Sequence, residues 1–252
     1  MNPNSYLTEM FLDEGIPILF IDFDGTISKR DVIDRILEEF ADERWLETED
    51  RWIAGEIGSR ECLQKQFSFV KAAPGELNEF IDALELDEGF LPLVNFCAES
   101  DIGIHIVSDG FDYYIRRMLD KAVLNRQQLR RINVWANRLT ASGENFWRTE
   151  FPHSRQVCGD GCATCKPAVM RLNNPYAAPS IFVGDGLSDR FAAVEADVVF
   201  AKGKLKDFCR KKTIPVTEYS NLRQVAESLD QAYESFALTL SGKQTHSWLQ
   251  AA

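Results

Sequence analysis

Short apolar runs that end in polar, glycine-containing segments are the clearest pattern along the chain. Three of them cover residues 16–23, 103–107 and 180–183, and each leads into acidic or hydroxyl side chains and a glycine. Continuous apolar runs of this length are typical of strands buried on both faces. Residues 197–201 and 214–217 are weaker strand candidates. The pattern therefore predicts several buried strands whose carboxyl ends open into polar loops.

Helical patterns lie between these strands. Apolar residues recur at helical spacing in residues 90–100, 111–124, 188–196 and 221–238. Strands that alternate with helices favour a parallel sheet with helices on both faces. Strand ends that carry acids and hydroxyls meet at one edge, where open α/β sheets bind their ligands. We therefore expect an α/β fold with a Rossmann-like parallel core.

Residues 31–86 interrupt the alternation. Helical stripes cover residues 32–40, 59–70 and 74–84, and no strand signal lies among them. We expect this segment to be an all-helical cap, inserted into a core made of residues 1–30 and 87–240.

Two other segments depart from the pattern. Residues 132–151 contain two β-like runs around Ala141-Ser142-Gly143, which predicts a small β-hairpin. The polar residues 241–252 are expected to form a flexible tail.

Composition narrows the range of partners. The 252 residues include 39 acids and 28 lysines and arginines, which gives a net charge of −11 and a pI near 4.9. Such a surface repels nucleic acids and anionic membranes, so neither is expected as a partner. The acidic N-terminus does not resemble a secretory signal, and no apolar run is long enough to span a bilayer. We expect a soluble, cytoplasmic protein with reduced cysteines, and the sequence leaves its oligomeric state open.

The strongest chemical signal is Asp22-Phe23-Asp24-Gly25-Thr26, at the end of the first expected strand. An ionised carboxylate in this position can attack phosphorus and form an aspartyl phosphate. A second carboxyl group two residues later can protonate the leaving oxygen and then activate water. The alternative is an ordinary acidic turn, because Asp and Gly are common turn residues.

A second acidic segment follows the third strand. Asp185 and Asp189 are four residues apart in Gly184-Asp185-Gly186-Leu187-Ser188-Asp189, a spacing that suits a hard cation such as Mg²⁺. The alternative is a turn that caps the next helix. Ser108, with the neighbouring backbone of Asp109 and Gly110, offers hydrogen bonds to a phosphate. Lys166, before Pro167 at an expected helix start, offers a cation.

These segments, in this order, resemble the four motifs of the haloacid dehalogenase-type phosphatases. The resemblance covers residues 16–217 and implies a Rossmann-like core with a helical cap. It implies that Asp22 is both nucleophile and Mg²⁺ ligand, and that Asp24 is the acid and base and binds the metal through its carbonyl. It also implies that Ser108 and Lys166 hold the phosphoryl group, that Asp185 binds the metal, and that Asp189 supports the metal or its waters.

A closer resemblance concerns the branch and the substrate. Asp31 lies where the phosphoserine phosphatase-like branch places a substrate-facing acid, usually Glu; equally, Asp31 can simply cap the helix 32–40. Pro152-His153-Ser154 and the cysteines before Lys166 resemble the methionine-salvage phosphatases that act on 2-hydroxy-3-keto-5-methylthiopentenyl-1-phosphate. Phosphocholine and phosphoethanolamine phosphatases carry nearby cysteines as well. A small phosphorylated metabolite is therefore the expected partner.

Two groups of side chains remain. Cys158, Cys162 and Cys165, with His153, could form a structural zinc site; the alternative is reduced thiols in a glycine-rich loop. Trp45, Trp52, Phe67 and Phe69 either line a pocket for an apolar substrate tail or form the core of the cap.

Other activities fit the same residues. The fold also supports phosphoserine phosphatases, phosphomutases and catalytically silent binding modules. The intact set of Asp22, Asp24, Lys166, Asp185 and Asp189 argues against a silent module, because such a module has no need to keep these residues together.

Overall fold

A mostly parallel, seven-stranded sheet forms the centre of the molecule. The computed structural model describes residues 3–13, 15–122, 124–156 and 158–247. Adjacent strands are parallel except for β3 and β4, which are antiparallel. In spatial order the strands are β4 (Phe146–Glu150), β3 (Ile132–Ser142), β2 (Gly103–Phe111), β1 (Ile18–Ile21), β5 (Ser180–Gly184), β6 (Val198–Ala201) and β7 (Thr217–Glu218).

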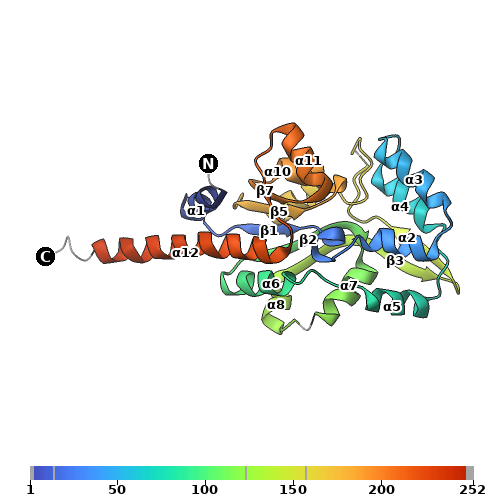
Figure 1. Cartoon of the computed structure of the whole chain (residues 1–252), viewed down its shortest axis with the longest axis horizontal. Coiled ribbons are helices and arrows are strands. Elements are labelled where there is room, and N and C mark those ends of the chain that lie inside the picture. Colours follow the sequence, from blue (N-terminus) through green and yellow to red (C-terminus); the bar gives the residue numbers. More distant parts are fainter. Residues whose placement is uncertain (1–2, 14, 123, 157, 248–252) are drawn as a thin grey trace.

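Alternate residues of the central strands enter two separate cores. Leu19 and Ile21 pack on one face of the sheet, and Phe20 packs on the other, as the period of two in a strand requires. The larger core lies under α1 (Pro3–Asp13), α6 (Phe90–Glu99), α7 (Asp112–Lys121) and α12 (Leu222–Ser247), with α8 (Arg126–Arg131) against α6. The smaller core lies under α9 (Lys166–Asn173), α10 (Arg190–Glu195) and α11 (Gly203–Lys212). The two groups of helices lie on opposite sides of the sheet (Figure 1). This is the predicted α/β architecture.

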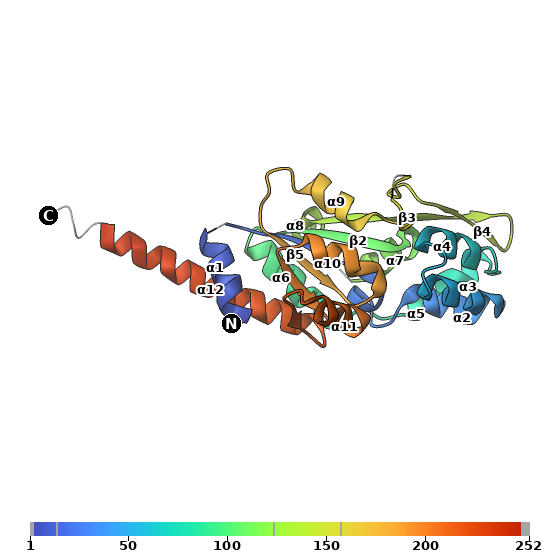
Figure 2. The ribbon, with the colours of Figure 1, turned by 90° about the horizontal axis from the view of Figure 1, so that it is seen from above.

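The first four of the five α-helices between β1 and β2 gather at one end of the molecule. α1 and the far end of α12 lie at the other (Figures 1 and 2). The four are α2 (Val32–Phe40), α3 (Arg44–Ile53), α4 (Ser59–Phe67) and α5 (Pro74–Ala83). The Asp31 side chain caps α2 by accepting a hydrogen bond from the N–H of Asp34 at 3.0 Å. A bridge between Ser28 and Leu86 joins the chain where it leaves the sheet to the chain where it returns. We use "cap" for the described helical segment α2–α5.

The predicted hairpin forms, and one of its two strands also belongs to the main sheet. β3 and β4 pair from Arg138–Glu150 to Ser142–Phe146. The first half of β3 pairs with β2 and is part of the main sheet, which the sequence pattern did not predict. The far half projects toward the cap, where the Trp147 indole N–H donates to the Ala72 carbonyl at 3.0 Å. The hairpin therefore links the sheet to the cap.

The two ends of the chain also differ from the expected pattern. α1 was not predicted, and α12 continues beyond residue 238 to Ser247. Within the chain, α3, α8 and α11 were also not predicted. The tail expected over 241–252 thus begins on α12, and residues 248–252 lie outside the described residues, so its flexibility stays a prediction. Within the described part of the chain, no helix combines the length and apolar character needed to cross a bilayer.

Candidate active site

The carboxyl ends of β1, β2 and β5 meet at the centre of the sheet, beneath the cap. Asp22 follows the last residue of β1, and its N–H donates to the Val183 carbonyl of β5 at 2.9 Å. The chain then turns through a tight loop, η1 (Phe23–Ile27), in which Gly25 has φ +70°. A Cβ on Gly25 would lie 2.5 Å from Asp185 Oδ2, so a side chain here would collide with the site. Glycine therefore lets the two acidic segments approach each other.

Three carboxylates converge at this edge of the sheet. Asp22, Asp185 and Asp189 each offer an oxygen within 4.8 Å of the others. Thr26 Oγ donates to Asp185 Oδ1 at 3.0 Å and fixes the orientation of that carboxylate. Burial raises the pKa of Asp185 to about 6, with the Asp189 charge as the second cause. Burial likewise raises the pKa of Asp22 well above its usual value, and the charge of Asp189 adds to it. Asp22 and Asp185, placed beside Asp189, therefore need a nearby cation to be ionised together.

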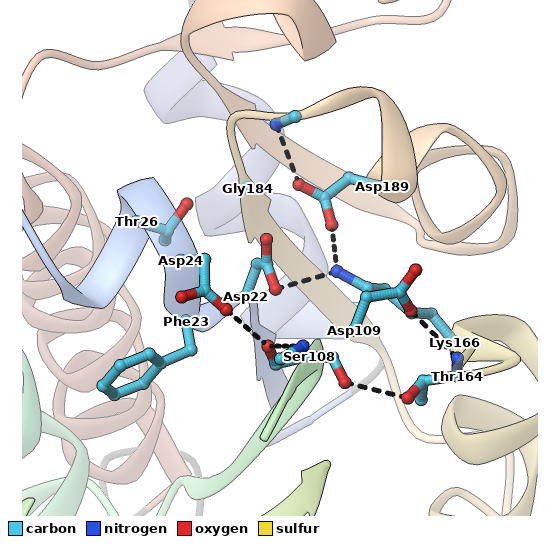
Figure 3. Close-up of polar contacts among 12 residues, drawn as sticks. Asp22, Phe23, Asp24, Thr26, Ser108, Asp109, Thr164, Lys166, Gly184 and Asp189 are labelled. Carbon is cyan, nitrogen blue, oxygen red and sulfur yellow. Dashed lines mark hydrogen bonds and ion pairs between the residues drawn. The ribbon is translucent and has the colours of Figure 1, made fainter. Parts of the chain in front are cut away.

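Lys166 is the cation already present. Its Nζ lies 2.8 Å from Asp22 Oδ1 and 2.5 Å from Asp189 Oδ1, and the side chain is 1% exposed (Figure 3). Burial alone would lower the pKa of Lys166, but the charges of Asp189 and Asp22 outweigh burial and raise it. The amine therefore stays protonated. Its place at the start of α9 brings it to this edge, as predicted from Pro167.

The residues fit a divalent metal ion. The donors are carboxylate oxygens, the ligands that Mg²⁺ prefers, and one ammonium group cannot neutralise three carboxylates. Asp22 Oδ1 is also buried without a hydrogen bond, because Lys166 Nζ is close to it but outside hydrogen-bond geometry. A buried carboxylate oxygen left in this state is costly unless another cation approaches it. Asp22 and Asp185 are therefore the best-placed metal ligands.

Asp24 has a different environment. Its carboxylate accepts hydrogen bonds from Tyr114 OH at 2.8 Å, from Ser108 Oγ at 3.1 Å and from the N–H of Val32 at 3.2 Å. Burial raises the pKa of Asp24 to about 6, although the bonds from Tyr114 and Ser108 oppose the shift. A carboxyl group with this pKa can both give and take a proton near neutral pH, as general acid–base catalysis requires.

Ser108 lies beside Asp24 and is hydrogen-bonded to it (Figure 3). Ser108 Oγ donates to Asp24 and accepts the N–H of Gly110 at 2.8 Å. A Cβ on Gly110 would lie 2.3 Å from Asp24 Oδ2, which explains the glycine. Asp109 accepts hydrogen bonds from Ser59 Oγ at 2.7 Å and from the Thr164 N–H at 2.9 Å, so both of its oxygens face protein donors. Ser108 must turn its hydroxyl away from Asp24 to donate to a phosphate.

A cavity of about 290 Å³ opens between this edge and the cap. Asp22, Asp24 and Ser108 lie on its floor, and Asp31, Asp34 and Glu49 line it from the cap. Lys204 is the one cation among the described residues that line it. Its apolar lining is Ile33, Trp52, Leu63 and Leu187. The cavity is thus strongly acidic with an apolar portion.

Asp31 and the cap aromatics now have definite places. Asp31 both caps α2 and lines the cavity, and burial and the charge of Asp24 raise its pKa well above the usual value. Of the four aromatics only Trp52 is in the cavity lining. Phe67 is buried against Phe111, and Trp45 packs on the main core. Phe69 lies beneath the Arg44 guanidinium at 4.7 Å. Most of the aromatics therefore form the structure of the cap.

The predicted zinc site is not supported. Cys158 and Cys162 have their sulfurs 3.7 Å apart, but among the described residues only Asp22, Asp185 and Asp189 form a metal-binding group of three or more. The His153 ring packs edge-on against Trp135, with centroids 5.4 Å apart. Cys158, Cys162 and Cys165 are free thiols.

The site residues can now be compared with known proteins. The family model described as haloacid dehalogenase-like hydrolase matches residues 19–193, which is more than half of the chain and includes every acid at the site. The chain belongs to this family.

Two bacterial members are similar over most of their length, and both are named 2-hydroxy-3-keto-5-methylthiopentenyl-1-phosphate phosphatase. The protein from Bacillus pumilus (strain SAFR-032) is 30% identical over 221 residues, which cover 86% of this chain and 93% of that one. The protein from Geobacillus thermodenitrificans (strain NG80-2) is 30% identical over 217 residues, or 85% and 96%. These relatives support a phosphatase within the family.

Solved structures confirm the fold. A phospho-aspartyl intermediate analogue of phosphoserine phosphatase has a TM-score of 0.65 at 17% identity, covering 84% of this chain and 98% of that one. The likeness is to the haloacid dehalogenase fold with its cap, as the sequence predicted.

Several site residues were not singled out from the sequence. Tyr114 and Thr26 orient Asp24 and Asp185, and Ser59, Glu49 and Gln66 approach from the cap. All are ordinary residue types on helices or in a loop. The one available signal was the place of Thr26 at the end of the first motif.

Proposed function

We propose that this phosphatase is Mg²⁺-dependent, forms an aspartyl phosphate on Asp22, and hydrolyses 2-hydroxy-3-keto-5-methylthiopentenyl-1-phosphate. The observation that carries the chemistry is the contrast between two neighbouring carboxyl groups. Asp22 lies against Lys166 and Asp185, whereas Asp24 lies among hydroxyl donors with a pKa of about 6. The first environment suits a nucleophile beside a metal, and the second suits a proton carrier.

The mechanism follows from these placements. A carboxylate oxygen of Asp22 attacks phosphorus, the bond from phosphorus to the substrate oxygen breaks, and Asp24 gives its proton to that oxygen. The ionised Asp24 then takes a proton from a water molecule that attacks the phosphoryl group. The bond from phosphorus to Asp22 breaks, and inorganic phosphate leaves. Lys166 holds Asp22 in place and contributes positive charge at the phosphoryl group.

A magnesium ion would be held by Asp22 and Asp185, with Asp189 in support and the Asp24 carbonyl as the ligand that the family resemblance implies. Bound there, it supplies the positive charge that lets a phosphate dianion enter a cavity lined by carboxylates.

The substrate assignment rests on the two relatives and on the cavity. A short phosphoester with an apolar end fits a cavity whose floor is polar and whose lining includes Trp52, Leu63 and Ile33. Phosphoserine fits less well, because its free carboxylate would face Asp31, Asp34 and Glu49 with Lys204 as the one lining cation among the described residues.

One observation favours a second candidate. Asp34, Glu49 and Trp52 together form an acidic and aromatic lining that would stabilise a cationic tail. Phosphocholine and phosphoethanolamine are therefore the alternative substrates.

The test is phosphate release from a panel of these four phosphoesters, with Mg²⁺ and with a chelator. Asp22→Asn removes the nucleophile, and Asp50→Asn, an exposed acid on α3, is the matched control. We expect Mg²⁺-dependent phosphate release that is lost in Asp22→Asn and kept in Asp50→Asn. Release should be fastest with 2-hydroxy-3-keto-5-methylthiopentenyl-1-phosphate, called the methylthio substrate below. Phosphorus NMR of the products distinguishes hydrolysis from a mutase. Full activity in Asp22→Asn would refute the mechanism, and a faster reaction with phosphocholine would refute the substrate.

A further inference from the structure

Ser59, the first residue of α4, belongs to the cap but binds the core. Its Oγ donates to Asp109 Oδ2 at 2.7 Å and accepts the N–H of Ala163 at 2.9 Å. Beside it, the N–H of Arg60 donates to the Gly161 carbonyl at 3.1 Å. Gly58 is so close that a Cβ there would lie 2.4 Å from the same carbonyl oxygen. The start of α4 is therefore docked on the loop that leads to Lys166.

Asp109 connects this docking point to both phosphoryl-binding segments. It follows Ser108 directly in β2, and its Oδ1 accepts the N–H of Thr164 at 2.9 Å. Thr164 Oγ donates to the Ser108 carbonyl at 2.8 Å, and Lys166 lies two residues further on (Figure 3). One carboxylate thus joins the cap, the Ser108 segment and the Lys166 segment.

The Asp109 carboxylate is occupied by these protein donors. Its negative charge would also repel a phosphate, so a direct contact with the phosphoryl group would be unfavourable. Its hydrogen bonds instead fix the backbone on either side of the phosphoryl site. A misplacement of about 1 Å in such a site can reduce the rate about 100-fold.

Ser59 and Asp109 also lie where two cavities adjoin. Both line the 290 Å³ cavity and a second cavity of about 240 Å³, which lies between the α3–α4 turn and residues 159–162. If α4 moved off the core, the Ser59–Asp109 bond would break and the two cavities would become one opening. A movement of α4 off the core would therefore also release Asp109.

We propose that Ser59 is a positioning residue of this phosphatase, acting through Asp109 to hold Ser108 and Lys166 in place only while α4 is docked on the core. The proposal rests on the proposed function for its kinetic consequence. Docking of the cap and assembly of the phosphoryl site are then one event, which prevents phosphoryl transfer while the site is open to water.

The kinetic test uses Ser59→Ala, with Ser68→Ala as the matched control. Ser68 is exposed at the opposite end of α4, and the described contact of its hydroxyl is to the Lys65 carbonyl at 2.6 Å. We expect Ser59→Ala to lower kcat about 10- to 100-fold with KM changed less than about threefold, and Ser59→Thr to restore most of kcat. Ser68→Ala should match wild type. An unchanged kcat in Ser59→Ala would overturn the proposal.

A double-mutant cycle tests whether Ser59 acts through Asp109. In Asp109→Ala the carboxylate that accepts from Ser59 is absent. Adding Ser59→Ala to Asp109→Ala should therefore lower kcat little further, whereas independent effects would multiply. Multiplied effects would overturn the proposal.

Hydrogen exchange provides a readout that needs neither substrate nor metal. Ser59→Ala removes the acceptor of the Ala163 N–H, so peptides covering 163–164 should exchange faster than in wild type or Ser68→Ala. Unchanged exchange there would overturn the proposal whatever the activity. Faster exchange with an unchanged kcat would refute the positioning role alone. If wild type released no phosphate from any compound of the panel, the proposed function itself would be refuted.

Discussion

Lys166 Nζ lies 2.5 Å from Asp189 Oδ1, and the two side chains are 1% and 0% exposed. The other oxygen of Asp189 accepts the N–H groups of Asp185 and Gly186, at 3.0 and 3.1 Å. Asp189 is thus held by the loop after β5 and in turn holds the lysine beside Asp22. Its carboxylate is therefore a support for Lys166 as well as a candidate metal ligand.

Breaking this buried pair should destabilise the protein strongly. Asp189→Ala leaves the Lys166 ammonium buried with one carboxylate partner fewer, and we expect the free energy of unfolding to fall by about 3–5 kcal/mol. Urea unfolding measures the change. Arg171→Ala breaks the exposed pair between Arg171 and Glu195 and is the control, with an expected loss of about 0–1 kcal/mol. Equal losses of unfolding free energy in Asp189→Ala and Arg171→Ala would contradict the expectation that the buried pair stabilises the fold more than an exposed one.

The role of Asp24 as proton carrier can be separated from binding by the choice of leaving group. In Asp24→Asn, we expect kcat for an alkyl phosphate to fall about 100- to 10,000-fold, because the leaving alkoxide needs a proton. p-Nitrophenyl phosphate should still transfer its phosphoryl group to Asp22, because nitrophenolate leaves unprotonated. Rapid-quench kinetics should show a burst of nitrophenol followed by slow turnover.

Tyr114→Phe is the control for that experiment. It keeps the carboxyl group of Asp24 and removes one donor to it. It should therefore retain turnover of both substrates. A loss of the nitrophenol burst in Asp24→Asn would show that Asp24 is needed for more than proton transfer.

The acidic cluster should make the stability of the metal-free protein depend on pH. Asp185 has a pKa of about 6 in the folded protein against 3.8 in the unfolded chain. Between these values the folded state binds the proton more tightly, so the stability contribution is present below pH 4 and is lost as pH rises to about 6. Asp185→Asn lacks this titration but keeps an acceptor for Thr26.

Urea unfolding in chelator from pH 4 to 7 measures this effect. The stability of Asp185→Asn relative to wild type should increase with pH, by roughly 1–3 kcal/mol over the range. Asp50→Asn, the exposed control, should show a constant difference. Adding Mg²⁺ at pH 7 should stabilise wild type much more than Asp185→Asn. If the stability of Asp185→Asn relative to wild type fell with rising pH, the raised pKa of Asp185 would be contradicted.

The cavity lining makes the two candidate substrates distinguishable by mutation. Trp52→Ala removes apolar lining and should raise KM for the methylthio substrate about tenfold or more, whereas Glu49→Gln should change it less than threefold. For phosphocholine, loss of the Glu49 charge should matter more. Leu46→Ala, an exposed residue on the same helix as Trp52, is the control. A larger effect of Glu49→Gln on the methylthio substrate would contradict the assignment of an apolar tail site.

Local sequence signals determined the central architecture. The apolar runs that became β1, β2 and β5 are buried on both faces, so they could be read without knowing their neighbours. Because parallel strands end at one edge, Asp22, Ser108 and Asp185 were expected to meet there, and they do. Pro167 likewise indicated the helix start at which Lys166 lies.

Elements stabilised by distant contacts were harder to predict. α3 has apolar residues along one face, Trp45, Leu46, Trp52 and Ile53, but it was not predicted. This face does not enter a core, because α3 packs mainly on α4 and leaves Leu46 and Ile53 exposed. β3 belongs to the main sheet because it forms backbone hydrogen bonds with β2, and those bonds leave no mark on side-chain periodicity. The zinc hypothesis was not supported for a similar reason: it rested on the spacing of the cysteines, and spacing does not decide which ligand atoms converge in the fold.

The sequence by itself determined the order of strands and helices and the acids that end the strands, because both depend on residues adjacent in the chain. The tertiary structure alone decided which groups surround each acid. It placed Tyr114 on Asp24, Lys166 between Asp22 and Asp189, and Ser59 on Asp109. These partners are 23 to 144 residues apart in the chain and use ordinary side chains. Only the packing of helices and sheet brings these partners within hydrogen-bond distance. Their proximity gives the similar carboxyl groups of Asp22 and Asp24 different chemistry.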